Sequence, residues 1–548
     1  METAPLHCDT VVIGGGIAGI VAAIELLSAG RRVTILDRDG EENFGGLATE
    51  SFGGILVVGS EEQRRAGIKD TPELALADWL AFGEFDQPGN ADELWPRRWA
   101  EAYVNECAAD VYRWLKTYGI SFLPLPLWVE RGQATRGNSV PRWHVVWGTG
   151  QGLMRQLIGQ LRNHPRRELL TLRFDMRVEG LLEESRRIVG CRGYTEDTRQ
   201  AFEVHADTVL VATGGINGSL ERVRRHWHAD WRTPPQTILN GAHQYADGRL
   251  HDAVQAIGGR LTHLDRMWNY AAGVHHWKPR KPEHGLSLVP PRSALWLNWT
   301  GERIGPQPLV TGFDTRDLVT QICRQERQYS WQLLNRKIAL KELAVSGAEF
   351  NPSIRNGSKL GLLRDLLFGN RWLYKEMTEH CPDLVIAATL PELVGKMNAL
   401  QGDDSVNLAT VADEISRYEA QIDLGAPYND QQLRRIAQVR EWKGDRLRTC
   451  KFQKILDPGA GPLIAIREFI ISRKSLGGIQ TDLDCRVLDA GGVAIPGLYA
   501  AGEAAGFGGG GMNGLRGLEG TFLGGCIYGA RRAAAAIAGK AITQRRST

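Results

Sequence analysis

The sequence predicts an α/β fold divided into two or three domains. Three observations lead to this prediction: a length of 548 residues, a strand–turn–helix–strand unit near the start, and two later apolar strands that end in small-residue turns. A chain of this length exceeds the usual size of one domain. Hydrophobic residues make up 43% and charged residues 24%, the balance of a globular protein that can bury a large core without disulfides.

The first unit lies between Thr10 and Gly40. Thr10–Ile13 is predicted to form a short buried strand, Gly14–Gly19 a tight turn, Ile20–Ala29 a helix that ends at Gly30, and residues 32–37 a second strand. A signal peptide requires basic residues before its apolar run, and no Lys or Arg precedes the run here. Glycines and an acid interrupt the run, so a membrane-spanning helix is not expected either.

The glycine spacing of this unit is typical of dinucleotide binding. Gly14 permits the turn, Gly16 lets a pyrophosphate approach the backbone, and Gly19 lets helix and strand pack closely. The helix N-terminus offers N–H groups and partial positive charge to the phosphates. Asp37 ends the second strand, where a carboxylate can accept the ribose hydroxyls. The alternative is a glycine turn in another kind of α/β protein.

Composition argues against several other classes of protein. The eight cysteines are scattered without a CxxC pair, so a metal site, a redox dithiol or a disulfide framework is not expected, and a reducing cytoplasm is favoured. The net charge of +3 favours no particular partner. Arg222–Arg225 is interpreted as part of a solvated helix face, because no nucleic-acid-binding motif accompanies it.

Two later segments indicate which dinucleotide is bound. Val204–Val211 is an apolar strand followed by the turn Ala212–Gly215, and Ile495–Glu503 is a second strand that contains GLYAAGE. With the first unit, these segments resemble the FAD fingerprints of the flavoproteins that include fumarate reductase, succinate dehydrogenase and 3-ketosteroid dehydrogenase. The similarity is greatest to the branch known as FAD-binding dehydrogenases, which also ends in a segment like Gly508–Cys526.

The resemblance implies a domain arrangement. It covers the N-terminal half and about the last hundred residues, and it is weak from about Leu261 to Thr449. A Rossmann-like FAD-binding domain is therefore expected in two pieces, residues 1–260 and 451–548. An α+β substrate or cap domain is expected as an insertion over residues 261–450.

The resemblance also implies how the cofactor is held. Asp37 would hold the adenosine ribose, Glu503 the ribityl chain, and the last helix would direct its N-terminus at the flavin. Ala48 replaces the usual serine, and the absence of a nearby histidine implies non-covalent FAD. The full set of predicted cofactor contacts, with no metal ligand, is Gly14, Gly16, Ile17, Ala18, Gly19, Asp37, Arg38, Gly45, Gly46, Gly53, Gly54, Val178, Ala212, Thr213, Gly214, Gly215, Gly502, Glu503, Gly520 and Thr521.

Arg516 is the first candidate catalytic residue. It falls at the arginine with which fumarate reductases hold a substrate carboxylate, although the preceding loop is three residues longer here. A guanidinium can bind a carboxylate through two hydrogen bonds or polarise a carbonyl. The alternative is a structural arginine. Arg473 and Lys474 replace two histidines of the family, and either act near the substrate or form a surface ion pair.

Tyr270 and His144 complete the catalytic candidates. Tyr270 lies near the place of a substrate-side histidine in the family, and His144 lies in a segment that faces the flavin in relatives. Gly301–Gln307 lacks the proton-delivery pattern of fumarate reductases, so fumarate is not expected as the substrate. Pro462–Ile464 lacks the C-terminal catalytic tyrosine of ketosteroid dehydrogenases.

These observations predict an FAD-dependent oxidoreductase that acts on CH–CH groups. It would desaturate a carbon–carbon bond next to a carbonyl or carboxylate by removing a proton and a hydride. The alternatives are a reductase of an activated double bond and a flavin-binding redox sensor without turnover. The expected partners are a small carbonyl or acidic substrate and an external electron acceptor or donor, with no nucleic acid and no integral membrane segment.

Overall fold

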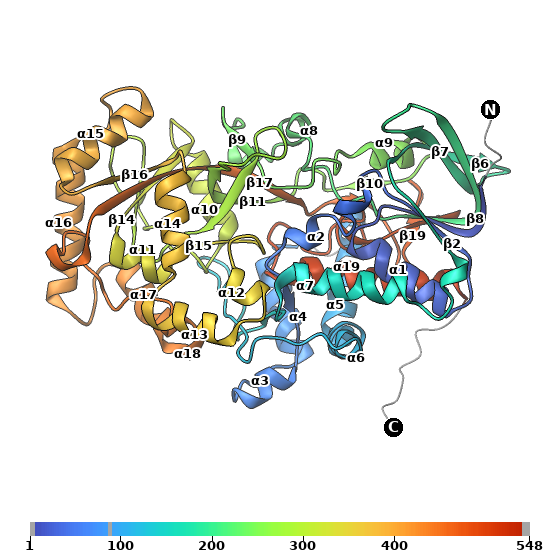
Figure 1. Cartoon of the computed structure of the whole chain (residues 1–548), viewed down its shortest axis with the longest axis horizontal. Coiled ribbons are helices and arrows are strands. Elements are labelled where there is room, and N and C mark those ends of the chain that lie inside the picture. The colour runs from blue at the N-terminus through green and yellow to red at the C-terminus, as the bar shows by residue number, and fades with distance from the viewer. Residues whose placement is uncertain (1–5, 86–89, 540–548) are drawn as a thin grey trace. The chain divides into compact units, whose positions relative to one another are not determined.

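The computed structural model describes residues 6–85 and 90–539 and confirms the predicted mixed α/β fold (Figure 1). The chain forms two compact units. Unit 1 contains the described residues of 1–226, 242–268 and 474–548, and unit 2 contains residues 227–241 and 269–473. Each unit has its own eight-stranded sheet.

The sheet of unit 1 is built on parallel strands. Its main path runs β19-β20-β8-β1-β2-β5, and β6 and β7 join through β8. Two short two-stranded sheets, β3 with β4 and β10 with β18, complete the unit. The strands are β1 (Leu6–Ile13), β2 (Val33–Leu36), β3 (Gly54–Leu56), β4 (Trp143–Val145), β5 (Leu170–Arg173), β6 (Met176–Glu184), β7 (Arg187–Thr195), β8 (Ala201–Val211), β10 (Leu261–Thr262), β18 (Gly478–Ile479), β19 (Arg486–Leu488) and β20 (Ala494–Ala500).

The register of these strands brings their carboxyl ends level with one another. Ile13 of β1 is paired with Leu36 of β2 and with Val211 of β8. Val211 is in turn paired with Ala500 of β20. Because all four strands are parallel, the segments that follow them leave the sheet at one edge.

Three helices of unit 1, α1, α7 and α19, lie side by side, since α1 packs against both of the others (Figure 1). Within α1, the apolar residues from Ile20 to Leu27 are almost completely buried. The helices of the unit are α1 (Ile17–Ser28), α2 (Leu47–Glu50), α3 (Glu61–Arg65), α4 (Pro72–Phe82), α5 (Ala91–Cys107), α6 (Trp114–Thr117), α7 (Thr149–Arg162), α8 (Leu220–Arg225), α9 (Arg249–Ala256) and α19 (Thr521–Ile537).

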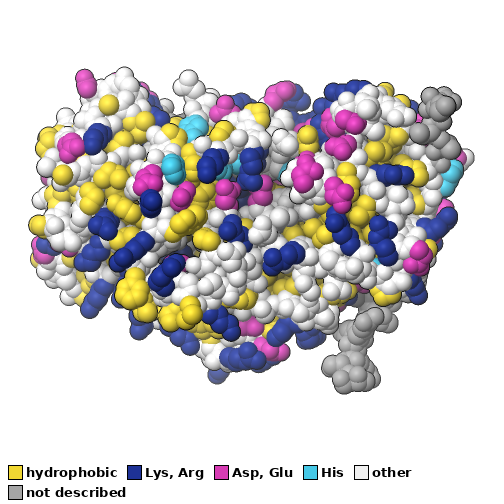
Figure 2. Space-filling model, viewed as in Figure 1, with side chains coloured by type: hydrophobic (Ala, Val, Ile, Leu, Met, Phe, Trp, Pro, Cys, Tyr) yellow, Lys and Arg dark blue, Asp and Glu magenta, His cyan; other side chains and the backbone are white. Residues whose placement is uncertain are grey.

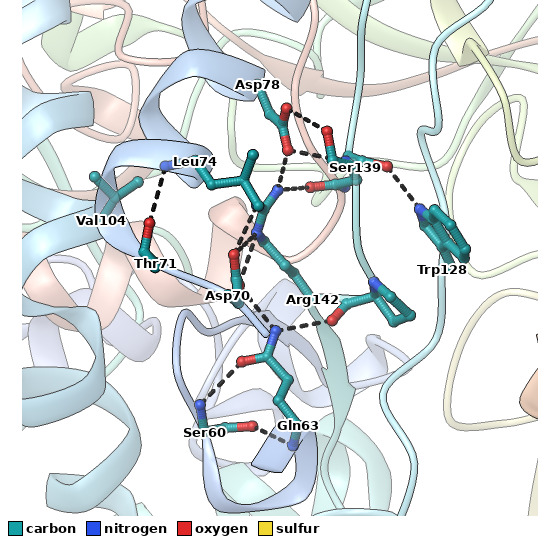
Figure 3. Close-up of polar contacts among 12 residues, drawn as sticks. Ser60, Gln63, Asp70, Thr71, Leu74, Asp78, Val104, Trp128, Ser139 and Arg142 are labelled. Atoms are coloured by element: carbon teal, nitrogen blue, oxygen red, sulfur yellow. Dashed lines mark hydrogen bonds and ion pairs between the residues drawn. The ribbon is translucent and has the colours of Figure 1, made fainter. Parts of the chain in front are cut away.

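A buried group of charges ties α4 to the chain that precedes β4. The Arg142 guanidinium donates to Asp70 at 2.8 Å and to Asp78 at 2.7 Å, and all three side chains are fully buried (Figure 3). Ser139 also donates to Asp78, from its backbone at 2.8 Å and its hydroxyl at 2.7 Å. Gln63 in α3 donates to Asp70 at 2.9 Å. Each buried charge therefore has an opposite charge and further hydrogen bonds.

The sheet of unit 2 has the order β13-β14-β17-β11-β12-β15, with β16 and β9 also paired to β17. Most of its pairs whose direction is defined are antiparallel, whereas β9 is parallel to β17. The strands are β9 (Ile238–Asn240), β11 (Met267–His275), β12 (Gly285–Val289), β13 (Leu295–Leu297), β14 (Tyr329–Asn335), β15 (Ala344–Val345), β16 (Leu384–Ala387) and β17 (Leu463–Ser475), and the ends of β11 and β17 reach into unit 1.

Helices fill most of the remaining sequence of unit 2. Asparagine, serine, threonine or aspartate caps most of them, as expected for residues whose side chains accept from the first-turn N–H groups. The helices are α10 (Thr315–Cys323), α11 (Arg336–Glu342), α12 (Pro352–Arg355), α13 (Lys359–Phe368), α14 (Arg371–His380), α15 (Leu390–Gln401), α16 (Leu408–Leu424), α17 (Gln431–Glu441) and α18 (Lys443–Arg446).

The observed boundaries differ slightly from those expected. The helix expected from Ile20 begins at Ile17, because Gly16 is extended and already serves as its N-cap. The C-terminal strand ends at Ala500, and Gly502–Ala504 forms a short 3-10 turn. Within the described parts of the chain, no helix is long and apolar enough to cross a membrane.

Candidate cofactor-binding and active site

The carboxyl edge of the unit 1 sheet gathers most of the predicted cofactor-binding residues. Gly14–Gly19 follows β1, Asp37 follows β2, Ala212–Gly215 follows β8, and Gly502–Glu503 lies just beyond β20. These four segments are far apart in the sequence, but the parallel register places them at the same edge. Ligands of open α/β sheets bind at this edge.

The three glycines after β1 meet different surroundings. Gly14 has a φ of +109°, and a Cβ there would lie 2.4 Å from the Ala212 carbonyl oxygen. A Cβ on Gly19 would lie 2.0 Å from the Gly14 oxygen. A Cβ on Gly16 would have no atom within 4 Å. The protein backbone therefore requires the first and third glycines, whereas Gly16 faces open space.

The N-terminus of α1 is open to an anion. Gly16 is its N-cap, no side chain caps it, and its first turn, which starts with Ile17 and Ala18, contains no acid. Free N–H groups and the helix dipole attract negative charge at such an end. Gly46 lies close by, because a Cβ on it would be 3.7 Å from the Gly16 Cα and near no other atom. The space around Gly16 and Gly46 can therefore accept a phosphate group.

The space around Gly16 and Gly46 forms a cradle for a phosphate group, and Gly45 lies next to it. Gly53 and Gly54 instead allow close packing of the backbone. The Gly45 N–H donates to the Gly15 oxygen at 3.0 Å. A Cβ on Gly53 would lie 2.7 Å from the backbone of Gly150, and a Cβ on Gly54 would lie 1.8 Å from the Trp143 ring. These last two glycines allow β3 to pack against β4 and the start of α7.

Asp37 is fixed by two backbone N–H groups. Gly15 donates to its Oδ2 and Asp39 to its Oδ1, each at 3.0 Å. Burial raises the pKa of the Asp37 carboxyl, against the lowering effect of the Asp39 hydrogen bond and of His243. The carboxylate is therefore oriented, and its remaining lone pairs can accept further hydrogen bonds.

Polar residues surround this acid. The Arg38 guanidinium donates to Asp247 at 2.8 Å and stacks on the Tyr245 ring at 4.3 Å. His243 Nε2 lies 3.2 Å from Asp39 Oδ2. His243 was not predicted from the sequence, where its only signal is its place just before the Tyr245–Gly248 segment.

Glu503 is positioned by a residue that the sequence analysis did not single out. The Ser475 N–H donates to Glu503 Oε1 at 2.9 Å. The Ser475 hydroxyl donates to Asn217 Oδ1 at 2.8 Å and accepts from the Ile216 N–H at 2.8 Å. Ser475 directly follows the Arg473–Lys474 pair, which was its only signal in the sequence.

Small residues allow the chain to pass close to Glu503. A Cβ on Gly215 would lie 2.5 Å from Glu503 Oε1. Gly502 has a φ of +71°, and a Cβ there would lie 2.9 Å from the Ala18 Cβ. Thr213 and Gly214, which precede Gly215, are half-buried. The turns after β8 and β20 therefore meet the start of α1.

The N-terminus of α19, like that of α1, has no side-chain cap. Gly520 is its N-cap with a φ of +96°, no side chain caps it, and its first turn has no acid. The hydroxyl of Thr521 donates to the Leu518 oxygen at 2.7 Å and so serves the local turn. The Lys474 ammonium lies 4.2 Å from the centre of the ring of Phe522, which follows Thr521 in the sequence.

Arg516 lies on the loop before α19 and is largely buried, with 12% of its side chain exposed. Its Nη1 is 2.8 Å from Oε1 of Glu84, which also accepts from the Thr135 hydroxyl at 2.9 Å. Glu84 has a φ of +45°, a left-handed conformation that is uncommon for glutamate. Nothing in the local sequence indicated this partner.

His144 and Val178 lie inside the fold. His144 Nδ1 is 2.7 Å from the Arg142 oxygen and Nε2 is 2.7 Å from the Ser60 hydroxyl. Burial lowers the pKa of this ring to about 4, so it is neutral at pH 7. Val178 is 4% exposed and belongs to the core beside the sheet. We assign no catalytic role to His144, because its nitrogens are already engaged.

Arg473 and Tyr270 belong to unit 2, whereas Lys474 and Arg516 belong to unit 1. The Arg473 guanidinium donates to the Gly241 oxygen at 2.7 Å and lies 5.9 Å from the centre of the Tyr270 ring. Within unit 2 these two candidates are therefore neighbours.

Together, the features of unit 1 define a dinucleotide-binding protein. The open cradle at Gly16 and Gly46, the uncapped helix α1 and the oriented Asp37 carboxylate fit a pyrophosphate with an adjoining ribose.

Comparison with known proteins specifies this class. The FAD binding domain family matches residues 9–523, and the chain belongs to this family. The KsdD-like steroid dehydrogenase of Mycobacterium tuberculosis H37Rv is 42% identical over 96% of this chain and 95% of its own length. The KsdD-like steroid dehydrogenase of Mycolicibacterium smegmatis is 40% identical over 94% and 96%.

Solved structures share the fold. The 3-ketosteroid-Δ4-(5α)-dehydrogenase of Rhodococcus jostii RHA1 has a TM-score of 0.62 and 20% identity, covering 97% of both chains. An open flavocytochrome c3 fumarate reductase has a TM-score of 0.68 and 19% identity, covering 98% of this chain and 79% of that one. The predicted flavoprotein family, FAD cofactor and FAD-dependent oxidoreductase class are confirmed.

Proposed function

We propose that this chain is a dehydrogenase that desaturates a carbon–carbon bond next to the carbonyl group of a steroid-like substrate. The observation that carries this proposal is the 42% identity to a KsdD-like steroid dehydrogenase across nearly the full length of both chains. The predicted small carbonyl substrate agrees with the name of this relative. An external acceptor would take the electrons away.

In this proposal, unit 1 is the Rossmann-like FAD-binding domain and unit 2 is the substrate or cap domain. When bound, FAD supplies the acceptor for a hydride. The N-terminus of α1 binds the pyrophosphate, Asp37 the adenosine ribose, and Glu503, held by the Ser475 N–H, the ribityl chain. The N-terminus of α19 stabilises negative charge near the flavin.

Arg516 is proposed to donate N–H groups to the carbonyl oxygen of the substrate. Negative charge develops on this oxygen as a proton leaves the adjacent carbon, and a planar guanidinium stabilises it. Lys474 and Arg473 are proposed to add positive charge on the substrate side, with Tyr270 beside Arg473. These proposed roles are supported by the positions of the residues near the sequence fingerprints and by their contacts within each unit.

The direction of the reaction is tested by anaerobic spectroscopy of the purified holoprotein. A saturated 3-ketosteroid should bleach the flavin absorbance and yield the unsaturated ketone. A urocanate reductase of Eggerthella lenta, 24% identical over 91% of this chain, motivates the reverse reaction as the second candidate. Reoxidation of dithionite-reduced protein by an enoate, without bleaching by any saturated ketone, would favour a reductase. Failure of both reactions would favour a redox sensor.

The FAD site itself is tested by a matched pair of glycine substitutions. Gly16 has a φ of −75°, which alanine can adopt, and a Cβ there touches no protein atom. Gly16→Ala should therefore fold normally but lose at least tenfold in FAD affinity, because the methyl group occupies the proposed phosphate space. Gly395, in helix α15 of unit 2, has equally open surroundings. Gly395→Ala should retain full FAD occupancy, and equal FAD affinity in both variants would refute the assignment.

A further inference from the structure

Helix α13 of unit 2 carries apolar side chains on the face that points to solvent. Leu360, Leu363 and Leu367 follow the spacing of one helix face and are 81%, 52% and 65% exposed. Leu362 and Leu366, on the opposite side, are half-buried. A surface helix normally places polar residues toward water. Packing within the chain therefore explains only one of the two apolar faces of α13.

The exposed apolar surface continues beyond the helix. Phe368 is 62% exposed, and Trp372, in the first turn of α14, is 40% exposed. Figure 2 shows hydrophobic side chains at the surface over α13, with lysine and arginine side chains around them. Exposed apolar patches with a polar rim mark interaction sites. The α13 patch is defined by Leu360, Leu363, Leu367, Phe368 and Trp372.

Bases outnumber acids in the chain around the α13 patch. Residues 353–375 include one acid, Asp365, and five bases, namely Arg355, Lys359, Arg364, Arg371 and Lys375, and the acids Glu376 and Glu379 follow in α14. The Asp365 carboxylate accepts from the Ser353 hydroxyl at 2.5 Å and from Arg364 at 3.2 Å, and 20% of its side chain is exposed. The Asp365 charge is therefore offset by Arg364, and Lys375 lies 3.9 Å from Glu379. Arg355, Lys359 and Arg371 add further positive charge beside the apolar surface.

We propose that the α13 patch docks the protein on the surface of an anionic phospholipid bilayer. Leucine, phenylalanine and tryptophan side chains can enter the boundary between headgroups and acyl chains, while flanking lysine and arginine side chains attract anionic headgroups. A second copy of the chain fits the patch less well, because a two-fold contact would bring two sets of five bases together. The proposal does not depend on the reaction that the protein catalyses.

Cosedimentation of the FAD-loaded protein with vesicles tests this proposal. Vesicles of phosphatidylcholine with phosphatidylglycerol should bind the protein, and vesicles of phosphatidylcholine alone should bind it at least tenfold more weakly. The double variant Leu363→Gln/Leu367→Gln should lose at least tenfold in affinity for the anionic vesicles. Arg364→Gln/Arg371→Gln should lose affinity and salt dependence together, because these side chains would supply the electrostatic attraction.

Leu424→Gln is the matched control, since Leu424 at the end of α16 is 71% exposed but lies outside the basic segment. It should bind vesicles as the unchanged protein does. Circular dichroism and FAD content establish that every variant is folded. Equal vesicle binding by the Leu363→Gln/Leu367→Gln protein, or no binding by the unchanged protein, would overturn the proposal. A smaller molecular mass of that double variant in sedimentation velocity would instead assign the patch to a second copy of the chain.

Discussion

The two eight-stranded sheets of this protein organise their polar groups differently. In unit 1, the parallel strands β1, β2, β8 and β20 end at one edge, where glycine turns, an acid and two uncapped helix ends gather. In unit 2, β14 is antiparallel to both of its neighbours, so successive connections lie at opposite ends of the sheet. A parallel sheet therefore concentrates backbone groups for one ligand, whereas the antiparallel sheet distributes its loops.

Buried charge shows the same contrast. In unit 1, Arg142 is paired with Asp70 and Asp78, and further hydrogen bonds satisfy the group (Figure 3). In unit 2, Glu468 on β17 is fully buried, and neither of its carboxyl oxygens has a hydrogen-bond partner among the described residues. Burial raises the pKa of Glu468 well above its ordinary value and so favours the protonated, neutral form of the side chain. The Arg142 group thus pairs its buried charges, whereas burial favours the uncharged form of Glu468.

The largest expected effect comes from breaking the buried group of unit 1. Arg142→Leu leaves the buried Asp70 without the Arg142 cation and Asp78 with Arg136 alone, which should cost about 3–5 kcal/mol in the free energy of unfolding. Chemical denaturation of the FAD-loaded protein measures this loss. The control is Arg417→Ala in unit 2, because the Arg417 side chain is exposed where it pairs with Asp413 and Glu414. This variant should cost about 1 kcal/mol or less. Similar losses in both variants would show that the buried Arg142 group contributes no more to stability than the ion pairs of Arg417.

The second prediction concerns the edge of the unit 1 sheet. Arg516→Ala should reduce turnover by about 10²–10³, because one stabilising donor to the substrate oxygen is lost. Arg516→Lys keeps the charge but loses the planar fork, so it should also lower turnover. Steady-state kinetics and flavin occupancy are measured together. Near-normal turnover in Arg516→Ala, or loss of flavin along with activity, would assign the arginine a structural role.

The third prediction concerns the buried Glu468 of unit 2. Because its pKa is raised on folding, the unfolded chain releases this proton first, and stability falls as pH rises above about 4.5. Glu468→Gln should remove this loss. An unchanged pH dependence of the unfolding free energy would show that Glu468 has a partner in solution.

The smallest expected effect has the opposite sign and lies in unit 1. Burial lowers the pKa of His144 to about 4, so the unfolded chain takes up the proton first as pH falls below about 6.5. Stability should decrease by about 2 kcal/mol from pH 7 to pH 5 because of this ring.

The His144→Asn variant should lose less stability over the same pH range, as measured by denaturation at both pH values. His275 in unit 2 is the control, since its hydrogen bond to Asp383 raises its pKa. Its contribution to stability is present at low pH and is lost as pH rises. His275→Asn should therefore change the pH dependence in the opposite direction, and a change in the same direction would contradict both assignments.

The parts of unit 1 that bind through the backbone could be predicted from the sequence. Gly14 and Gly19 are required by contacts within a few residues or with an adjacent parallel strand, and such requirements leave a short pattern in the sequence. Asp37 could be identified because the end of a strand fixes its position. The α/β class followed from these local patterns, and the FAD cofactor and the oxidoreductase class followed from the resemblance of the patterns to a flavoprotein family.

The partners of side chains could be found only in the tertiary structure. The Ser475 contact with Glu503 and the Glu84 contact with Arg516 join positions that lie on separate segments of the chain. The pairing of Arg142 with Asp70 and Asp78, the solitary Glu468 and the exposed face of α13 likewise depend on which surfaces pack together. Backbone conformation is a local property, so the sequence determined the glycine turns and the acid after β2. Burial and pairing are properties of the packed chain, so the tertiary structure decided which charges are satisfied and which apolar side chains remain in water.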